Sequence, residues 1–365
     1  MASLFDYLDW RGDLEFSQVS PGEVDNAIFS ELCFIDYAGI VSAGLDSKVS
    51  LINAARKYLR AHKGESAYIG VLVPAAIVSL LAKCAKSKRF GQISLTGYIN
   101  HIDPDKTVQF SGITFVLDDD HIFVAFRGTD DSLVGWRENF NMAFMHPIPA
   151  QTEAVSYLET VAEHFADRKI IIGGHSKGGN LAVYATVKCN NSIKDRIERV
   201  YNNDGPGFDR SFIDSIDYIN MRDKIRIFLP QASVVGMLLE HESGYDVIKS
   251  RQSGLMQHDI MSWEVLGNKF IRLNTVTRES KFLDATLKHW LNEMTAEERE
   301  RFIDSLFDAI SASGVTTLTE LMSEKLHLLK VWGTLNEETK SLLLKSVKIY
   351  MRERARILRE EKGRK

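Results

Sequence analysis

Apolar residues in the middle of the chain come in short runs, and segments with a helical stripe separate most of them. The runs 110–117 and 121–126 flank three aspartates, and an acidic turn between apolar runs predicts a β-hairpin. Further strands are predicted at 169–172, 199–202, 224–229 and 245–250, and helices at 154–165 and 180–186. This alternation from about 110 to 262 favours an α/β domain with a mainly parallel sheet and an antiparallel start.

The two ends of the chain carry mainly helical patterns. Ser20 and Pro21 are typical of a helix start, and apolar spacing predicts further helices at 51–61 and 73–85. Near the other end, Thr295 and Glu298 form a capping box sequence, and another helix is predicted to open at Asn336. We expect a helical N-terminal part at 1–105 packed on a core at 106–276, followed by a helical appendage at 277–365 with a basic tail.

Composition narrows the class of protein. The 365 residues are 44% hydrophobic and 26% charged, as in ordinary globular proteins, and the net charge of −4 gives no reason to expect nucleic acid binding. Cys33, Cys84 and Cys189 lie far apart without metal-ligand spacing. The start lacks the pattern of a secretory signal, and the longest apolar run, 69–81, is too short to span a bilayer. We expect a cytoplasmic protein of bacterial type with no metal and no cofactor.

The last 15 residues, 351–365, hold seven basic and three acidic side chains. Such a segment is typical of a solvated tail, and the alternatives are a peripheral contact with a membrane surface or with nucleic acid.

The most informative motif is Gly-His-Ser-Lys-Gly at 174–178, which has the G-x-S-x-G pattern of a nucleophile elbow. An elbow is a strained turn from a strand into a helix, and the residues two before and two after the serine must be small. Gly174 and Gly178 meet this demand. Because the motif lies between a predicted strand and a predicted helix, Ser176 is the candidate nucleophile.

A serine nucleophile needs a base, usually a histidine held by a carboxylate. In α/β-hydrolases the acid and then the histidine follow the serine along the chain. His258 is the preferred base, because it lies in a loop directly after the last predicted strand of the sheet. The other histidines after the serine are expected to have surface or packing roles, and they are His241, His289 and His327.

Two motifs together resemble a known family. Val-Ala-Phe-Arg-Gly-Thr-Asp at 124–130 follows a predicted strand, and Gly-His-Ser-x-Gly-Gly comes later. This combination resembles class 3 lipases of the α/β-hydrolase superfamily, which have a three-layer sandwich fold. The resemblance implies that Thr129 and the backbone N–H of Lys177 bind the oxyanion, and Trp136 and Asn139 also match. The Asp-Tyr-Leu, Asn-Asp-Gly-Pro-Gly-Phe and Gln-His-Asp segments resemble a bacterial lipase-like branch, a domain of unknown function with lysine after the serine.

The sequence departs from the lipase pattern in two places. Lys177 replaces the usual leucine, and we expect its ammonium group in solvent, with attraction of an anionic substrate as the alternative. Ser233 stands where class 3 lipases have the acid of the triad. Asp204, which ends the strand before that position, is therefore the preferred acid. Glu240, Glu242 and Asp223 are the other candidates, and a Ser–His dyad without an acid remains open.

The segment after Thr129 is rich in apolar residues and is expected to form either a lid or part of the core; it contains Trp136, Phe140, Met142, Phe144 and Met145. Taken together, the motifs predict a serine hydrolase that cleaves a carboxylic ester of a small molecule or lipid through an acyl-enzyme on Ser176. A thioesterase, amidase or peptidase would use the same groups. The alternative of another class is a binding protein on a hydrolase fold without catalysis, and the presence of Ser176, His258 and Thr129 opposes it.

Overall fold

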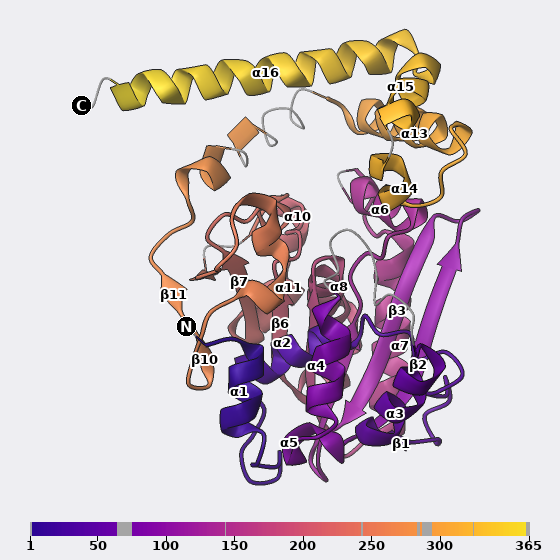
Figure 1. The fold of residues 1–365 in the computed structure, drawn as a ribbon, viewed down its shortest axis with the longest axis vertical. Helices are drawn as coiled ribbons and strands as arrows, with labels where there is room; N and C mark the ends of the chain where they lie inside the picture. The colour runs from indigo at the N-terminus through magenta and orange to yellow at the C-terminus, as the bar shows by residue number, and fades with distance from the viewer. Residues whose placement is uncertain are drawn as a thin grey trace.

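A mixed β-sheet forms the centre of the molecule, with helices on both of its faces (Figure 1). The computed structural model describes residues 2–63, 75–142, 144–241, 244–282, 285–286, 294–323 and 325–362. Within these ranges nine strands make up the sheet, and their spatial order is β1 (Val49–Ser50), β2 (Ser94–Asp103), β3 (Val108–Val116), β4 (His121–Phe126), β5 (Lys169–His175), β6 (Ile197–Asn203), β7 (Ile225–Pro230), β8 (Tyr245–Ile248) and β11 (Arg272–Leu273).

The directions of the strands confirm the predicted α/β class. Neighbours from β4 to β8 are parallel, whereas β1 to β4 and β8 with β11 are antiparallel pairs. Because parallel strands need crossover connections, helices lie between them along the chain. The carboxyl ends of β4 to β8 consequently meet at one edge of the sheet, which is where open α/β sheets place their sites.

Alternate residues of each central strand point to opposite faces, and both faces are covered. Ile170 and Ile172 of β5 join the core under the helices that follow β4, whereas Ile171 joins the core under the N-terminal helices. The first group of helices is α6 (Leu133–Asn141), α7 (Pro149–His164), α8 (Lys177–Lys188), α9 (Asn191–Lys194), α10 (Arg210–Ile213) and α11 (Ile216–Met221). The second is α1 (Leu4–Arg11), α2 (Glu23–Leu32), α3 (Leu51–Ala61), α4 (Ala76–Cys84) and α5 (Lys88–Gly91).

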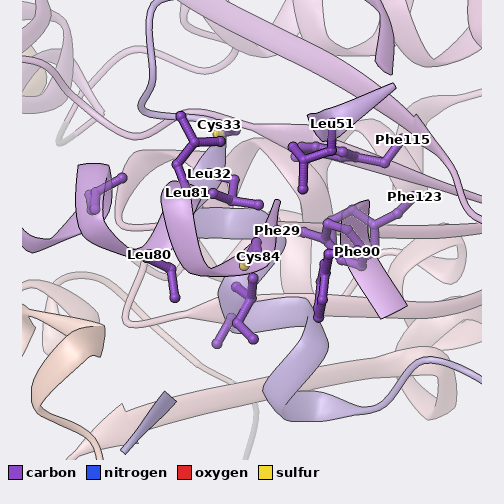
Figure 2. Close-up of a cluster of buried hydrophobic side chains, with 14 of the residues drawn as sticks. Phe29, Leu32, Cys33, Leu51, Leu80, Leu81, Cys84, Phe90, Phe115 and Phe123 are labelled. Atoms are coloured by element: carbon purple, nitrogen blue, oxygen red, sulfur yellow. The ribbon is translucent and has the colours of Figure 1, made fainter. Parts of the chain in front are cut away.

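Aromatic packing attaches the N-terminal helices to the sheet (Figure 2). The ring of Phe29 on α2 lies 4.9 Å from that of Phe115 on β3 and 4.7 Å from that of Phe123 on β4, between ring centroids. Phe90 of α5 packs against the same ring at 5.2 Å. Buried aromatic pairs of this kind combine a large apolar area with a preferred geometry, so α2 is held firmly against the centre of the sheet.

The C-terminal helices form a third apolar core that includes α6. These helices are α13 (Ala296–Ala312), α14 (Leu318–Ser323), α15 (Lys325–Thr334) and α16 (Glu337–Lys362). Phe302 and Phe307 of α13 pack with Leu133 and Trp136 of α6. In Figure 1 the long α16 extends across the top of the view, away from the sheet. Among the helices within the described ranges, none is long and apolar enough to cross a bilayer.

The remaining elements are short and lie at the sheet's β8 side or in loops. They are the hairpin β9 (Val265–Leu266) and β10 (Lys269–Phe270) and the 3-10 helices η1 (Arg222–Lys224), η2 (Val235–Met237), η3 (Gly254–His258) and η4 (Ile260–Ser262).

Most predicted elements are present, with two corrections. The N-terminal part is not wholly helical, because 94–103 forms β2, a full member of the sheet. The first predicted helix start is also displaced: α2 begins at Glu23 after Gly22, not after Ser20. The capping box at Thr295 is confirmed, since its side chain accepts a hydrogen bond from the backbone N–H of Glu298. The three-part division of the chain stays a prediction, and part of the apolar run at 69–81 lies outside the described residues.

Candidate active site

The turn at Ser176 has the backbone of a nucleophile elbow. Ser176 follows β5 and precedes α8. Its backbone angles, φ +57° and ψ −130°, are ones that residues other than glycine rarely adopt. A Cβ on Gly174 would strike the backbone of Gly178, and one on Gly178 would strike the carbonyl oxygen of Phe126. The two glycines therefore permit the close packing that holds Ser176, half-buried, at the carboxyl edge of the sheet.

Asp204 and His258, which are 54 residues apart in the chain, meet at the same edge. His258 Nδ1 lies 2.6 Å from Asp204 Oδ2, and the exposed fractions of the two residues are 6% and 0%. Asp204 directly follows β6 and has φ +50°, and its N–H donates to the carbonyl oxygen of Phe228 on β7. The neighbouring Gly205 lies so close to the elbow that a Cβ would strike the carbonyl oxygen of Ser176. The turn after β6 thus packs against the elbow and brings the Asp204 carboxylate to the same edge of the sheet as Ser176.

Ser233 contacts the carboxylate of Asp204. Its Oγ donates a hydrogen bond of 2.5 Å to Asp204 Oδ1, so the two carboxylate oxygens have different partners. The residue at the lipase acid position therefore supports the acid that the preceding strand supplies. Two hydrogen bonds to Gln257 fix the loop that carries His258. The side-chain oxygen of Gln257 accepts one from the backbone N–H of Ala232, and its backbone carbonyl accepts the other from the indole N–H of Trp263.

The other candidate acids and bases lie elsewhere or outside the described residues. Asp223 is exposed and directly precedes β7, at the edge of the sheet opposite the elbow. Glu240 pairs through its backbone with Phe208, and His241 Nε2 contacts the carbonyl oxygen of Gly236. Glu242 and His289 fall outside the described residues. His327 lies on α15, in a stretch where the structure describes the backbone alone.

A second histidine, His175, packs against His258 from beneath the elbow. Their ring centroids are 4.5 Å apart, and His175 Nδ1 lies 3.0 Å from Oε1 of Glu31 on α2. Burial raises the pKa of Glu31 to about 8 and lowers that of His175 to about 3, so both are uncharged at neutral pH. The pKa of the neighbouring Asp259 is raised to about 6, mainly by burial and to a smaller extent by Glu31. The ring of His258, the candidate base, thus has an uncharged histidine as its neighbour.

Sequence reasoning missed Glu31, although one signal was present. Glu31 falls four residues after Ala27 and three after Ile28, on the apolar stripe of a helix that the pattern already predicted. A carboxylate at a position that faces the core is rarely accidental, because an ionised carboxylate is costly to bury.

The end of β4 passes against the elbow on its other side. A Cβ on Gly128 would come within 3.1 Å of Ser176 Cβ and 2.6 Å of the carbonyl oxygen of His175. Thr129 follows directly, and its Oγ1 accepts a hydrogen bond of 2.5 Å from Asn139 Nδ2 on α6. The two residues that the lipase resemblance assigned to the oxyanion, Thr129 and Lys177, therefore lie on the two segments that meet at Ser176.

The prediction of a solvent-exposed Lys177 ammonium is wrong. The side chain is completely buried, and Nζ donates to Gln109 O at 2.7 Å, Gln109 Oε1 at 2.6 Å and Glu138 Oε2 at 2.8 Å. Burial lowers the pKa of this lysine, and the charge of Glu138 opposes that effect. The lysine turns inward because β3 and α6 present a carboxylate and two amide oxygens there, a set that a local pattern around residue 177 does not reveal.

The apolar segment after Thr129 is packed as core, which was the alternative to a lid. Met142 lies in the core shared with α7 and α8, and Met145 packs against it. Trp136 and Phe144 pack into the C-terminal core, and Phe140, although partly exposed, has its ring 5.7 Å from that of Phe307. Helix α6 is thus enclosed between the sheet and α13.

Comparison with known proteins places these residues in a family. The family model described as Mbeg1-like matches residues 84–308, which include Thr129, Ser176, Asp204 and His258. Together with the strand order, this match confirms the relationship to lipase-like α/β-hydrolases that the motifs indicated. No curated protein matches the chain.

Three solved lipase structures from fungi are similar to this chain. A fungal lipase–inhibitor complex is 12% identical with a TM-score of 0.35, and the match covers 56% of this chain and 82% of the lipase. The Rhizomucor miehei lipase propeptide complex is 14% identical with a TM-score of 0.32, over 43% and 55% of the two chains. Lip2 lipase from Yarrowia lipolytica is 13% identical with a TM-score of 0.35, over 65% and 81%.

Proposed function

This chain belongs to the Mbeg1-like family, and we propose that it is a serine hydrolase that cleaves carboxylic esters. The observation that carries the proposal is the buried Asp204–His258 pair, 2.6 Å apart, at the sheet edge that also carries the strained Ser176. A carboxylate against Nδ1 of a histidine beside an elbow serine is the constellation of serine hydrolases on unrelated folds.

The assignment of roles follows from the bonds around each group. Because Asp204 occupies Nδ1 of His258, Nε2 is the nitrogen that takes the proton of Ser176 as its oxygen attacks the ester carbonyl. Asp204 fixes the tautomer and stabilises the imidazolium. The negative charge that develops on the carbonyl oxygen is stabilised by the N–H of Lys177, at the amino end of α8, and by Thr129. Water then hydrolyses the acyl-enzyme, with His258 again as base.

Labelling with a fluorophosphonate probe tests the nucleophile directly. We expect the wild-type protein and Ser156→Ala, a control at an exposed serine of α7, to be labelled, and Ser176→Ala to remain unlabelled. Equal labelling of Ser176→Ala, or an unlabelled wild type, would refute the proposal.

The substrate class is tested by turnover. p-Nitrophenyl esters of increasing chain length, an acyl thioester and an anilide are compared, with Ser176→Ala as the blank. Preference for the ester supports the proposed class, and preference for the thioester or the anilide replaces it with thioesterase or amidase activity. A wild-type protein that neither reacts with the probe nor turns over any of the three substrates favours the binding-protein alternative.

A further inference from the structure

We infer that Lys177 and Glu138 are positioning residues, whose buried ion pair sets the spacing between the two oxyanion donors. This inference rests on the proposed function and adds to it the role of two side chains that touch no reacting atom. Lys177 carries one proposed donor on its own backbone, and Glu138 precedes Asn139, which binds the other donor residue, Thr129.

The Lys177 ammonium ties the elbow to two other elements. An ammonium group has three hydrogens to donate, and the three acceptors of Lys177 are the backbone and side-chain oxygens of Gln109 on β3 and Oε2 of Glu138 on α6. All three residues are completely buried. The first residue of α8 is therefore held through its side chain by three hydrogen bonds of 2.6 to 2.8 Å.

Glu138 extends the same connection to the second donor. Its Oε2 also accepts a hydrogen bond of 3.0 Å from Gln109 N, and its Oε1 accepts one of 2.9 Å from Ala150 N near the start of α7. Helix α6 is thereby fixed against β3 and α7. The next residue of α6, Asn139, donates to Thr129 Oγ1 at 2.5 Å. Lys177 is thus connected to Thr129 in three steps: its hydrogen bond to Glu138, the peptide bond from Glu138 to Asn139, and the hydrogen bond from Asn139 to Thr129.

Close packing of α6 on Thr129 supports this connection. A Cβ on Gly135, one turn before Glu138 and Asn139, would lie 2.9 Å from Thr129 Cγ2 and 2.9 Å from Gln109 Oε1. Glycine at position 135 therefore allows α6 to pack closely on the loop of Thr129. Oxyanion donors act only over about 2.7–3.1 Å, so the position of α6 matters for the reaction.

Stability alone does not account for an ion pair at this place. Replacing a buried ion pair by apolar side chains of similar volume is often neutral or stabilising. An apolar side chain would fill the space but would leave α6 free to settle by packing, whereas charged hydrogen bonds have fixed lengths and directions. The geometry therefore assigns the pair a role in placing the donors.

The test compares Lys177→Met, the double variant Lys177→Met/Glu138→Gln and Lys188→Met, a control at the exposed end of α8. Each is measured for kcat and KM on a p-nitrophenyl ester, for inhibition by a trifluoromethyl ketone, whose tetrahedral adduct places an oxyanion at the donors, and for urea unfolding. We expect Lys177→Met to lose at least tenfold in kcat and in ketone affinity, with KM changed less than about threefold; removal of a whole donor costs about 10²–10³-fold.

The double variant separates positioning from folding. It removes both charges and leaves no buried unpaired ion, so it should recover much of the unfolding free energy while kcat stays low, even if the single variant fails to fold. Recovery of kcat in parallel with stability, or a folded Lys177→Met within twofold of wild type in kcat and ketone affinity, would overturn the inference. A wild type that neither turns over ester nor reacts with a fluorophosphonate refutes the proposed function, and the inference falls with it.

Discussion

Glu31 provides a sharp test of the electrostatics beneath the site. Its carboxyl group is completely buried, lies 3.0 Å from His175 and has a pKa raised to about 8 from the ordinary 4.5, chiefly by burial. We predict that Glu31→Gln, which keeps the shape of the side chain but cannot ionise, stabilises the protein at alkaline pH and not at acid pH.

The sign and the size follow from proton linkage. Between pH 4.5 and 8 the unfolded chain has released the Glu31 proton whereas the folded protein still holds it, so the free energy of unfolding falls as pH rises through this window. The displacement is about 3.5 units, and at about 1.4 kcal/mol per unit it amounts to about 5 kcal/mol at pH 8 and above. That is a large part of the total stability of a typical domain, about 5–15 kcal/mol.

The assay is urea unfolding of wild type and Glu31→Gln at half-unit steps from pH 4.5 to 9, followed by tryptophan fluorescence and circular dichroism. The difference in unfolding free energy should be within about 1 kcal/mol at pH 4.5, grow through the window and level off near pH 8. Glu163→Gln, at an exposed position of α7, serves as the matched control and should show no such growth.

A difference that is constant from pH 4.5 to 9 would refute the reasoning, because it would mean that Glu31 ionises equally in the folded and unfolded states. A difference that keeps growing above pH 8, without levelling off, would place the folded-state pKa of Glu31 higher than its burial beside His175 and His258 implies.

Two further predictions concern the acid and the last helix. Asp204→Asn should lower kcat on a p-nitrophenyl ester about 10⁴-fold, as acid loss does in serine proteases, and Ser233→Ala, which leaves the His258 contact intact, should cost no more than about tenfold; a mild effect of Asp204→Asn would remove it from the triad. We also propose that α16 contacts anionic lipid through its basic end and its exposed Leu344, Val347 and Met351. The full-length protein should then sediment with anionic vesicles and less with neutral ones, and Val347→Glu/Met351→Glu should abolish sedimentation; equal behaviour of variant and wild type would contradict the proposal.

Local sequence was sufficient for the elbow and for the class of fold. The demand for a small residue at Gly174 arises partly within five positions, because a Cβ there would clash with Gly178, whereas a Cβ at Gly178 would clash with the distant Phe126. The alternation of strands and helices likewise depends on periodicity within each segment. Strand β2 escaped this reasoning, since its residues 94–103 combine apolar and polar positions with Gly97, which has φ +65°, and a register shift between Thr96 and Ile99.

The partners of Ser176 depended on the tertiary structure. Asp204 meets His258 only because parallel β6 and its neighbours end at the same edge, and Ser233 donates to that carboxylate from the loop after the next strand, β7. Lys177 was expected in solvent, yet its acceptors come from β3 and α6, 68 and 39 residues away along the chain respectively. A side chain's partners are decided by which distant segments pack beside it, and periodicity along the chain contains no information about that choice. The sequence by itself determined the turn that carries Ser176, the candidate nucleophile, and the packing of separate elements decided which charges surround it.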